Sequence, residues 1–79
     1  MEQIIYNGSL EELNSLDKNS QYKIVSHYFR TNGYNITRIL FGLENELKEA
    51  NLDGLVNART FEATNFTFVE GTPIKRIEK

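Results

Sequence analysis

The chain has 79 residues, which corresponds to one domain near the smallest size that folds alone, and we expect a single domain over residues 1–79. Hydrophobic residues make up 39% and charged residues 25% of the sequence, which is typical of a soluble globular protein and excludes a disordered chain. The net charge of −2 argues against a broad phosphate-binding surface, so we expect no nucleic-acid partner.

The start of the chain predicts a short strand followed by a short helix. Residues 2–6 favour a strand, which the turn-forming pair Asn7 and Gly8 ends. Ser9 and Glu12 have the spacing of a capping box, in which the Ser9 side chain accepts a hydrogen bond from the Glu12 amide. A short helix is therefore expected after Ser9, before a polar loop.

Residues 22–30 form the clearest predicted strand, because β-branched and aromatic residues are frequent there. Apolar side chains fall on both of its faces. A strand of this kind is usually covered on both sides, so we expect a second layer over it from another subunit or from the N-terminal helix. A turn at residues 31–33 is expected to follow.

The next segment has the periodicity of a helix over residues 35–51. Asn35 is a suitable N-cap, and Gly54 is expected to follow the helix in a left-handed conformation. The apolar residues recur on one helical face, namely Ile36, Ile39, Leu40, Leu43, Leu47 and Ala50. The carboxylates Glu44, Glu46 and Glu49 are interpreted as part of the solvated face. We favour this long helix.

A second interpretation of the same segment stays open. Asn32 and Gly33 also suit a hairpin turn, which would make residues 34–41 a strand and leave only residues 43–51 helical. Gly42 supports this alternative, because a glycine inside a helix costs about 1 kcal/mol relative to alanine. In the long helix, Gly42 would instead permit the close approach of a strand or a neighbouring molecule.

The remainder predicts two further strands, over residues 55–64 and 66–77, with Asn65 in the turn between them. Pro73 has no amide donor, so its part of the last strand is expected at an edge or a bulge. The whole pattern indicates an α+β fold. We expect a small antiparallel sheet with one main helix packed on it, built as a β-α-β-β core with an extra N-terminal strand and short helix.

Small size and composition predict self-association. A domain this small usually needs a disulfide, a metal or a partner subunit. Disulfides are impossible without cysteine, and His27 alone cannot build a tetrahedral zinc site within one chain. We therefore expect no cofactor, no bound metal and a homo-oligomer. The N-terminus has no signal-peptide pattern and no apolar run could span a membrane, so we expect no membrane partner and a cytoplasmic location.

Residues 50–59 and 69–75 carry a family resemblance. The sequence Ala-Asn-Leu-Asp-Gly-Leu-Val-Asn-Ala-Arg, followed by Val-Glu-Gly-Thr-Pro-Ile-Lys, resembles the carboxy-terminal half of the YbjQ-like family, which is labelled heavy-metal-binding. That family is similar to the dodecins in having a β-α-β-β unit. The resemblance implies this unit as the fold and a ring-shaped oligomer, and no ligand set of its own.

No catalytic motif is present in the sequence, so we expect a non-enzymatic binding protein that possesses a ligand site between subunits. A small anionic ligand is the expected chemistry, and its candidate residues are His27, Arg38, Arg59 and Lys75. The candidate subunit-interface residues are the strand aromatics Tyr22, Tyr28, Phe29, Phe66 and Phe68. Glu62 and Glu70 are expected to oppose Arg59 or Lys75 across the sheet.

Two alternative functions are kept. The first is an interaction inhibitor or accessory factor, such as one that a phage or mobile element encodes, which would use its sheet edge or aromatic face on a host protein. The second is an enzyme whose active site lies at a subunit interface and is centred on His27, although a packed strand histidine is the simpler interpretation of this residue.

Overall fold

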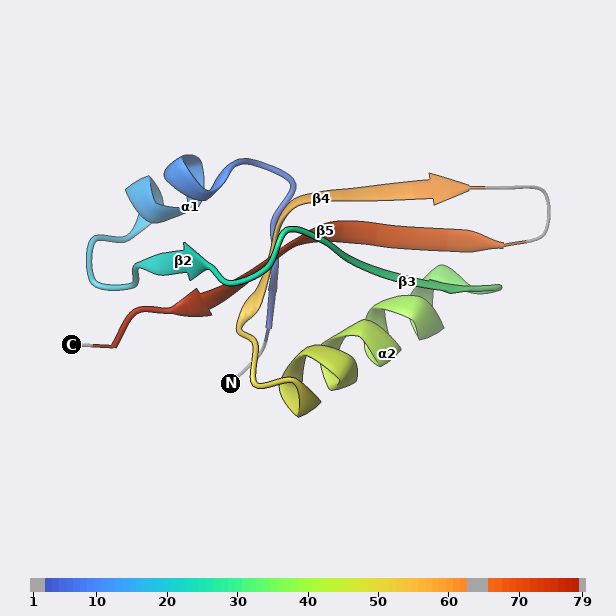
Figure 1. Ribbon diagram of the computed structural model, residues 1–79. Coiled ribbons are helices and arrows are strands. Elements are labelled where there is room, and N and C mark those ends of the chain that lie inside the picture. Colours follow the sequence, from blue (N-terminus) through green and yellow to red (C-terminus); the bar gives the residue numbers. More distant parts are fainter. Residues whose placement is uncertain (1–2, 63–65, 79) are drawn as a thin grey trace.

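The computed structural model describes residues 3–62 and 66–78, and the α+β class predicted from the sequence is confirmed (Figure 1). The elements in chain order are β1 (Ile4–Ile5), α1 (Leu10–Leu16), β2 (Tyr22–Ile24), β3 (Phe29–Gly33), α2 (Ile36–Glu49), β4 (Gly54–Glu62) and β5 (Thr67–Arg76). The predicted turn at Asn65 lies outside the described residues. No helix among the described residues is long and apolar enough to cross a membrane.

One mixed sheet contains all five strands, in the order β1-β4-β5-β2, with β3 also paired to β5. The ladders between β5 and its neighbours β2, β3 and β4 are antiparallel, as the sequence predicts. The extra N-terminal strand β1 pairs in parallel with β4, which makes the sheet mixed rather than wholly antiparallel. Strand β5 is therefore the centre to which the other long strand, β4, and two of the three short strands, β2 and β3, attach.

The single strand predicted over residues 22–30 is wrong, because β2 and β3 are separate strands on the same side of β5. The break lies opposite Pro73, whose carbonyl accepts a hydrogen bond of 3.1 Å from the Val25 amide. In an antiparallel strand, the N–H and the C=O of one residue point toward the same neighbouring strand. Proline has no N–H, so Pro73 can accept a hydrogen bond from this neighbour but cannot donate one. The ladder consequently stops, and the chain leaves it until Phe29.

Pro73 thus lies in the central strand, where the pairing on the β2 and β3 side is interrupted, while on the β4 side it lies in regular register opposite Leu55. The pairing of β4 with β5 shifts between Val56 and Arg59. Pro73 was expected at an edge or a bulge, and it lies at neither: the irregularity between β4 and β5 begins beyond its neighbour Thr72. Residues 23–28 are exposed in the single chain, so the N-terminal helix does not cover them, and cover from another subunit stays a prediction.

The turn predicted at residues 31–33 is also wrong. These residues continue β3 and pair with β5, where Thr31 lies opposite Val69 and Gly33 lies opposite Thr67. Pairing with a long central strand outweighs the local turn preference of Asn32 and Gly33. The chain turns instead at the two residues that follow β3.

Helix α2 confirms the long-helix interpretation and excludes the hairpin. The Asn35 side chain accepts hydrogen bonds from the amides of Thr37 at 2.9 Å and Arg38 at 3.4 Å, so it caps the helix as expected. The predicted apolar stripe is only partly buried. Its buried members are Ile39, Leu43 and Leu47, whereas Ile36, Leu40 and Ala50 are exposed.

The left-handed residue expected at Gly54 is found earlier, at Asn51, which has a φ of 58°. Gly54 begins β4, where β1 approaches it so closely that a Cβ atom would lie 2.1 Å from the Ile4 carbonyl oxygen. Glycine is therefore needed here to admit a neighbouring strand and not to end the helix.

The two helices cover opposite faces of the sheet. Leu55 of β4 belongs to a buried cluster under α2, whereas the next residue, Val56, belongs to a cluster under α1 with Leu13 and Ile74. Successive strand residues point to opposite faces, so the two clusters lie on opposite sides of the sheet. Figure 1 shows the helices at opposite ends of it, and each face is therefore covered over only part of its length.

We predict that Gly54→Ala lowers the free energy of unfolding by about 2–3 kcal/mol, because the added methyl group must displace β1. Urea denaturation measures the effect. Gly42→Ala is the matched control, since a Cβ at Gly42 meets no atom within 4 Å, and it is expected to stabilise the helix by up to about 1 kcal/mol. Equal stability of Gly54→Ala and the wild type would contradict the close approach.

Candidate functional site

The structure does not bring the four predicted ligand residues together. His27 lies in the exposed segment between β2 and β3. Arg38 is in the first turn of α2, Arg59 is on β4 beside Tyr28, and Lys75 is near the end of β5, directly opposite Lys23. Arg38, Arg59 and Lys75 line three different hollows, so they do not form one anion site within a single chain.

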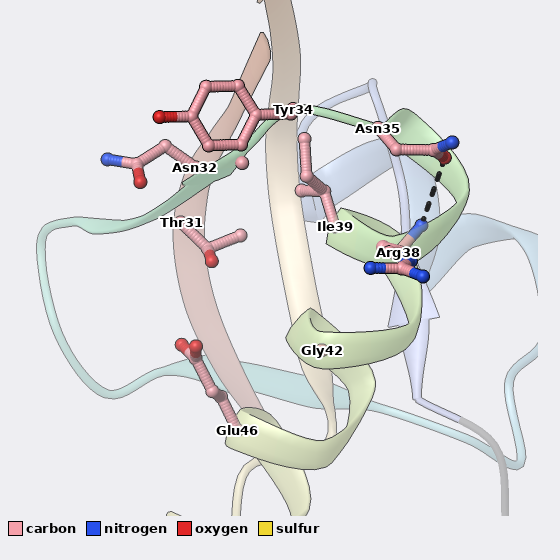
Figure 2. A pocket seen from close by; sticks show the side chains of 9 residues that line it. Thr31, Asn32, Tyr34, Asn35, Arg38, Ile39, Gly42 and Glu46 are labelled. Carbon is pink, nitrogen blue, oxygen red and sulfur yellow. Dashed lines mark hydrogen bonds between the residues drawn. The ribbon is translucent and has the colours of Figure 1, made fainter. Parts of the chain in front are cut away.

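The largest of these hollows is a groove of about 580 Å³ between β3 and α2, which we call the α2–β3 groove (Figure 2). One wall is the outer part of β3 and the turn that follows it, and the other is a flank of α2. Its lining residues are Thr31, Asn32, Gly33, Tyr34, Asn35, Arg38, Ile39, Gly42 and Glu46. Tyr34 is the one aromatic residue in this lining, and 88% of its surface is accessible.

Figure 2 shows Gly42 on the helix between Arg38 and Glu46, on the side that lines the groove. Apart from its two chain neighbours and the nearby backbone of its own helix, no atom of the described residues lies within 4 Å of the position that a Gly42 Cβ would take. The close approach that Gly42 was expected to permit is therefore not made by a strand of the same chain. A glycine inside a helix lowers its stability, and here no internal packing contact requires it.

A second exposed surface lies on the other face of the sheet. Val69 is buried under α2, so its neighbour Phe68 points to the opposite face. The Phe68 ring centroid lies 5.1 Å from that of Phe61 and 6.1 Å from that of Phe66, and the Arg30 guanidinium carbon lies 4.1 Å from it. We call Arg30, Phe61, Phe66 and Phe68 the aromatic face.

Charged residues and a tyrosine border the aromatic face. Glu70 lies opposite Arg30 on one side and opposite Arg59 on the other, which confirms the expected pairing of Glu70 with Arg59. The Tyr28 hydroxyl donates a short hydrogen bond to the Glu70 carboxylate. This hydrogen bond raises the pKa of Tyr28 above its ordinary value. The arrangement fixes Tyr28 beside the aromatic face.

The predicted interface aromatics divide between core and surface. Tyr22 packs against the cluster under α1, and Phe29 packs against the cluster under α2, so both are half-buried within the chain. Phe68 is half-buried in the aromatic face, and Tyr28 and Phe66 are exposed. Reasoning from the sequence missed Phe61, although its spacing on β4 places it across from Phe68.

The groove was missed as well. Its signal was the four-residue spacing of Arg38, Gly42 and Glu46, which places all three on one flank of a helix. Interpreting the carboxylates as a uniformly solvated face hid that relation.

No family model matches the chain, and neither a curated protein nor a solved structure matches it. The resemblance to the YbjQ-like family stays a prediction. Among residues 3–62 and 66–78, no group of three or more histidine, cysteine, aspartate or glutamate side chains could hold a metal ion.

We predict that Glu70→Gln lowers the pKa of Tyr28 toward its ordinary value, because the variant loses the charged acceptor of the Tyr28 hydroxyl. Ultraviolet titration of tyrosinate measures this pKa, and Tyr28→Phe identifies which step belongs to Tyr28. In the wild type, the raised pKa means that the contribution to stability is complete below the ordinary tyrosine pKa and is lost as the pH rises through the raised value. An unchanged Tyr28 titration in Glu70→Gln would contradict the hydrogen bond.

Proposed function

We propose that this protein is a small non-enzymatic binding protein that works as a homo-oligomer. The observation that carries the proposal is the number of large hydrophobic side chains left at the surface. Among the described residues, eight hydrophobic side chains are buried and eleven large ones are exposed. Exposed apolar residues that lie next to one another mark sites of association, and a second subunit would cover them.

Four of these eleven exposed residues lie at or beside the first half of α2. Tyr34, Ile36, Leu40 and Phe41 are exposed by 88%, 41%, 40% and 70%. Of α2 itself, the sheet covers only the stripe of Ile39, Leu43 and Leu47. This supports an interface that includes α2. A small anionic ligand held in the α2–β3 groove would meet Arg38, the only predicted ligand residue that lines the groove, whereas Leu40 and Phe41 line a separate hollow.

The placement of the reactive side chains supports binding over catalysis. General acid-base catalysis needs groups within hydrogen-bond reach of one substrate. His27 lies in the segment between β2 and β3, Arg38 starts α2, and Lys75 lies near the end of β5. A composite active site would require the symmetry of an assembly to bring such residues together.

We predict that the purified protein forms an oligomer whose mass rises with concentration to a fixed multiple of the chain mass. Light scattering gives the mass of the assembly in solution. Native mass spectrometry reports whether a small anionic ligand remains bound. A monomer at every concentration tested would overturn the proposal of a homo-oligomer.

The aromatic face favours one second candidate, a protein that acts by binding another protein. Phe61 and Phe66 are exposed by 38% and 39%, and Arg30 lies over Phe68. Aromatic residues and arginine are enriched at the energetically dominant positions of protein interfaces. Such a face would suit an inhibitor or accessory factor that docks on a host protein.

For this candidate, we predict that Phe61→Ser together with Phe66→Ser weakens binding of a stoichiometric protein partner by about thirtyfold or more. Affinity capture with the tagged chain identifies the partner, and titration calorimetry measures the affinity. Leu16→Ser is the matched control, because Leu16 is 69% exposed on α1, away from the aromatic face. An equal loss in the control would contradict a specific role for the face.

A further inference from the structure

The groove flank of α2 is self-complementary in charge. Arg38, Gly42 and Glu46 follow one another at intervals of four residues, and all three line the α2–β3 groove. If a second α2 lay antiparallel to the first and crossed it at Gly42, each Arg38 would face the Glu46 of the other copy. The same flank therefore presents both members of two equivalent ion pairs, which is the property that a two-fold interface requires.

The charges of α2 oppose the dipole of their own helix. Its first turn contains Arg38 and no acidic residue, whereas Glu46 and Glu49 lie near its C-terminus. A helix favours acidic residues at its N-terminus and basic ones at its C-terminus, and only Lys48 meets that preference here. An antiparallel neighbour reverses the situation, because the carboxylates at the end of one helix then lie beside the N-terminus of the other.

The strand beside the groove is also available for pairing. Among the described residues β3 pairs with β5 alone, so its outer edge borders the groove. Antiparallel pairing of two β3 strands around a two-fold axis would join the two sheets into one. Unpaired strand edges of this kind are natural sites of association.

The position of α2 makes the strand and helix contacts compatible. α2 runs back along β3 after the turn at Tyr34 and Asn35, and it packs against both β3 and β5 (Figure 1). Each helix would then lie about one strand spacing from the two-fold axis, so the two helix axes would be about 10 Å apart. Packed helices lie at about 8–10 Å, where a glycine at the crossing leaves room for the side chains around it.

We propose that a second copy of this chain occupies the α2–β3 groove, with the β3 strands paired and the α2 helices antiparallel about Gly42. This inference rests on the proposed homo-oligomer and names one interface of it, which includes Tyr34 but not Leu40 and Phe41, since those two line a different hollow. Each subunit supplies Glu46 to the Arg38 of the other, and Tyr34 becomes covered. The groove is therefore one half of an interface that the second copy completes.

The test exchanges the two charges one at a time. In Arg38→Glu, both cross-helix pairs join two carboxylates, and in Glu46→Arg, both join two guanidinium groups. We expect each variant alone to dimerise at least about tenfold more weakly than the wild type. Mixed in equal amounts, the two variants restore two opposite-charge pairs, and we expect heterodimers with an affinity close to that of the wild type.

Both positions are exposed, so the exchanges leave the core of the chain intact. Sedimentation velocity measures association, and circular dichroism checks the fold of each variant. Because Arg38→Glu also removes a charge that opposes the helix dipole, its monomer is expected to be at least as stable as that of the wild type. Lys48→Glu is the matched control for charge reversal on α2, and it is expected to leave dimerisation unchanged because Lys48 does not line the groove.

Gly42→Leu supplies an independent variant. Its side chain finds open space in one chain and would obstruct the crossing of two helices, so we expect a folded protein that associates more weakly. If the wild type associates while the single charge variants associate equally well, or their mixture shows no recovery, the interface is wrong and the homo-oligomer stands. If the wild type is monomeric throughout, both proposals fail.

Discussion

Strand β5 is the element on which the whole structure depends, because β2, β3 and β4 all pair with it. Two short strands share one of its sides only because Pro73 withdraws a hydrogen-bond donor between them. That interruption lets the chain leave the sheet after β2 and return to it at Phe29. One backbone position therefore accounts for the end of the β2 ladder, and β3 and α2 follow where the chain pairs with β5 again at Phe29.

The second constraint is the supply of apolar residues. A chain of 79 residues cannot cover both faces of such a sheet, and it places one helix over part of each. What remains uncovered is therefore divided as well. The aromatic face lies on the side of the sheet away from α2, and the α2–β3 groove lies between α2 and the edge strand β3. Because the two exposed surfaces are separate, the groove could hold a second copy of the chain while the aromatic face binds another protein.

Elements with a strong local signal were predictable from the sequence. The capping residues Ser9 and Asn35 occupy the N-caps of the two helices, and the β4 and β5 strands were found within a few residues. The break in residues 22–30 was not predictable, because its cause is Pro73, which is distant in sequence and adjacent only in the sheet. The role of Gly54 was misinterpreted for the same reason, since glycine is required there by the close approach of Ile4 of β1, which is distant in sequence. The groove likewise exists only once β3 and α2 are placed together.

Helix α2 links the fold to the proposed assembly. As the helix of an isolated subunit it has two costs, a glycine at its middle without an internal contact and charges that oppose its own dipole. Gly42 and two of these charges, Arg38 and Glu46, lie on the flank that faces the groove. In an antiparallel pair the same glycine permits the crossing and the same charges attract. Features that weaken one copy and favour two are most simply explained when the stable unit is the pair.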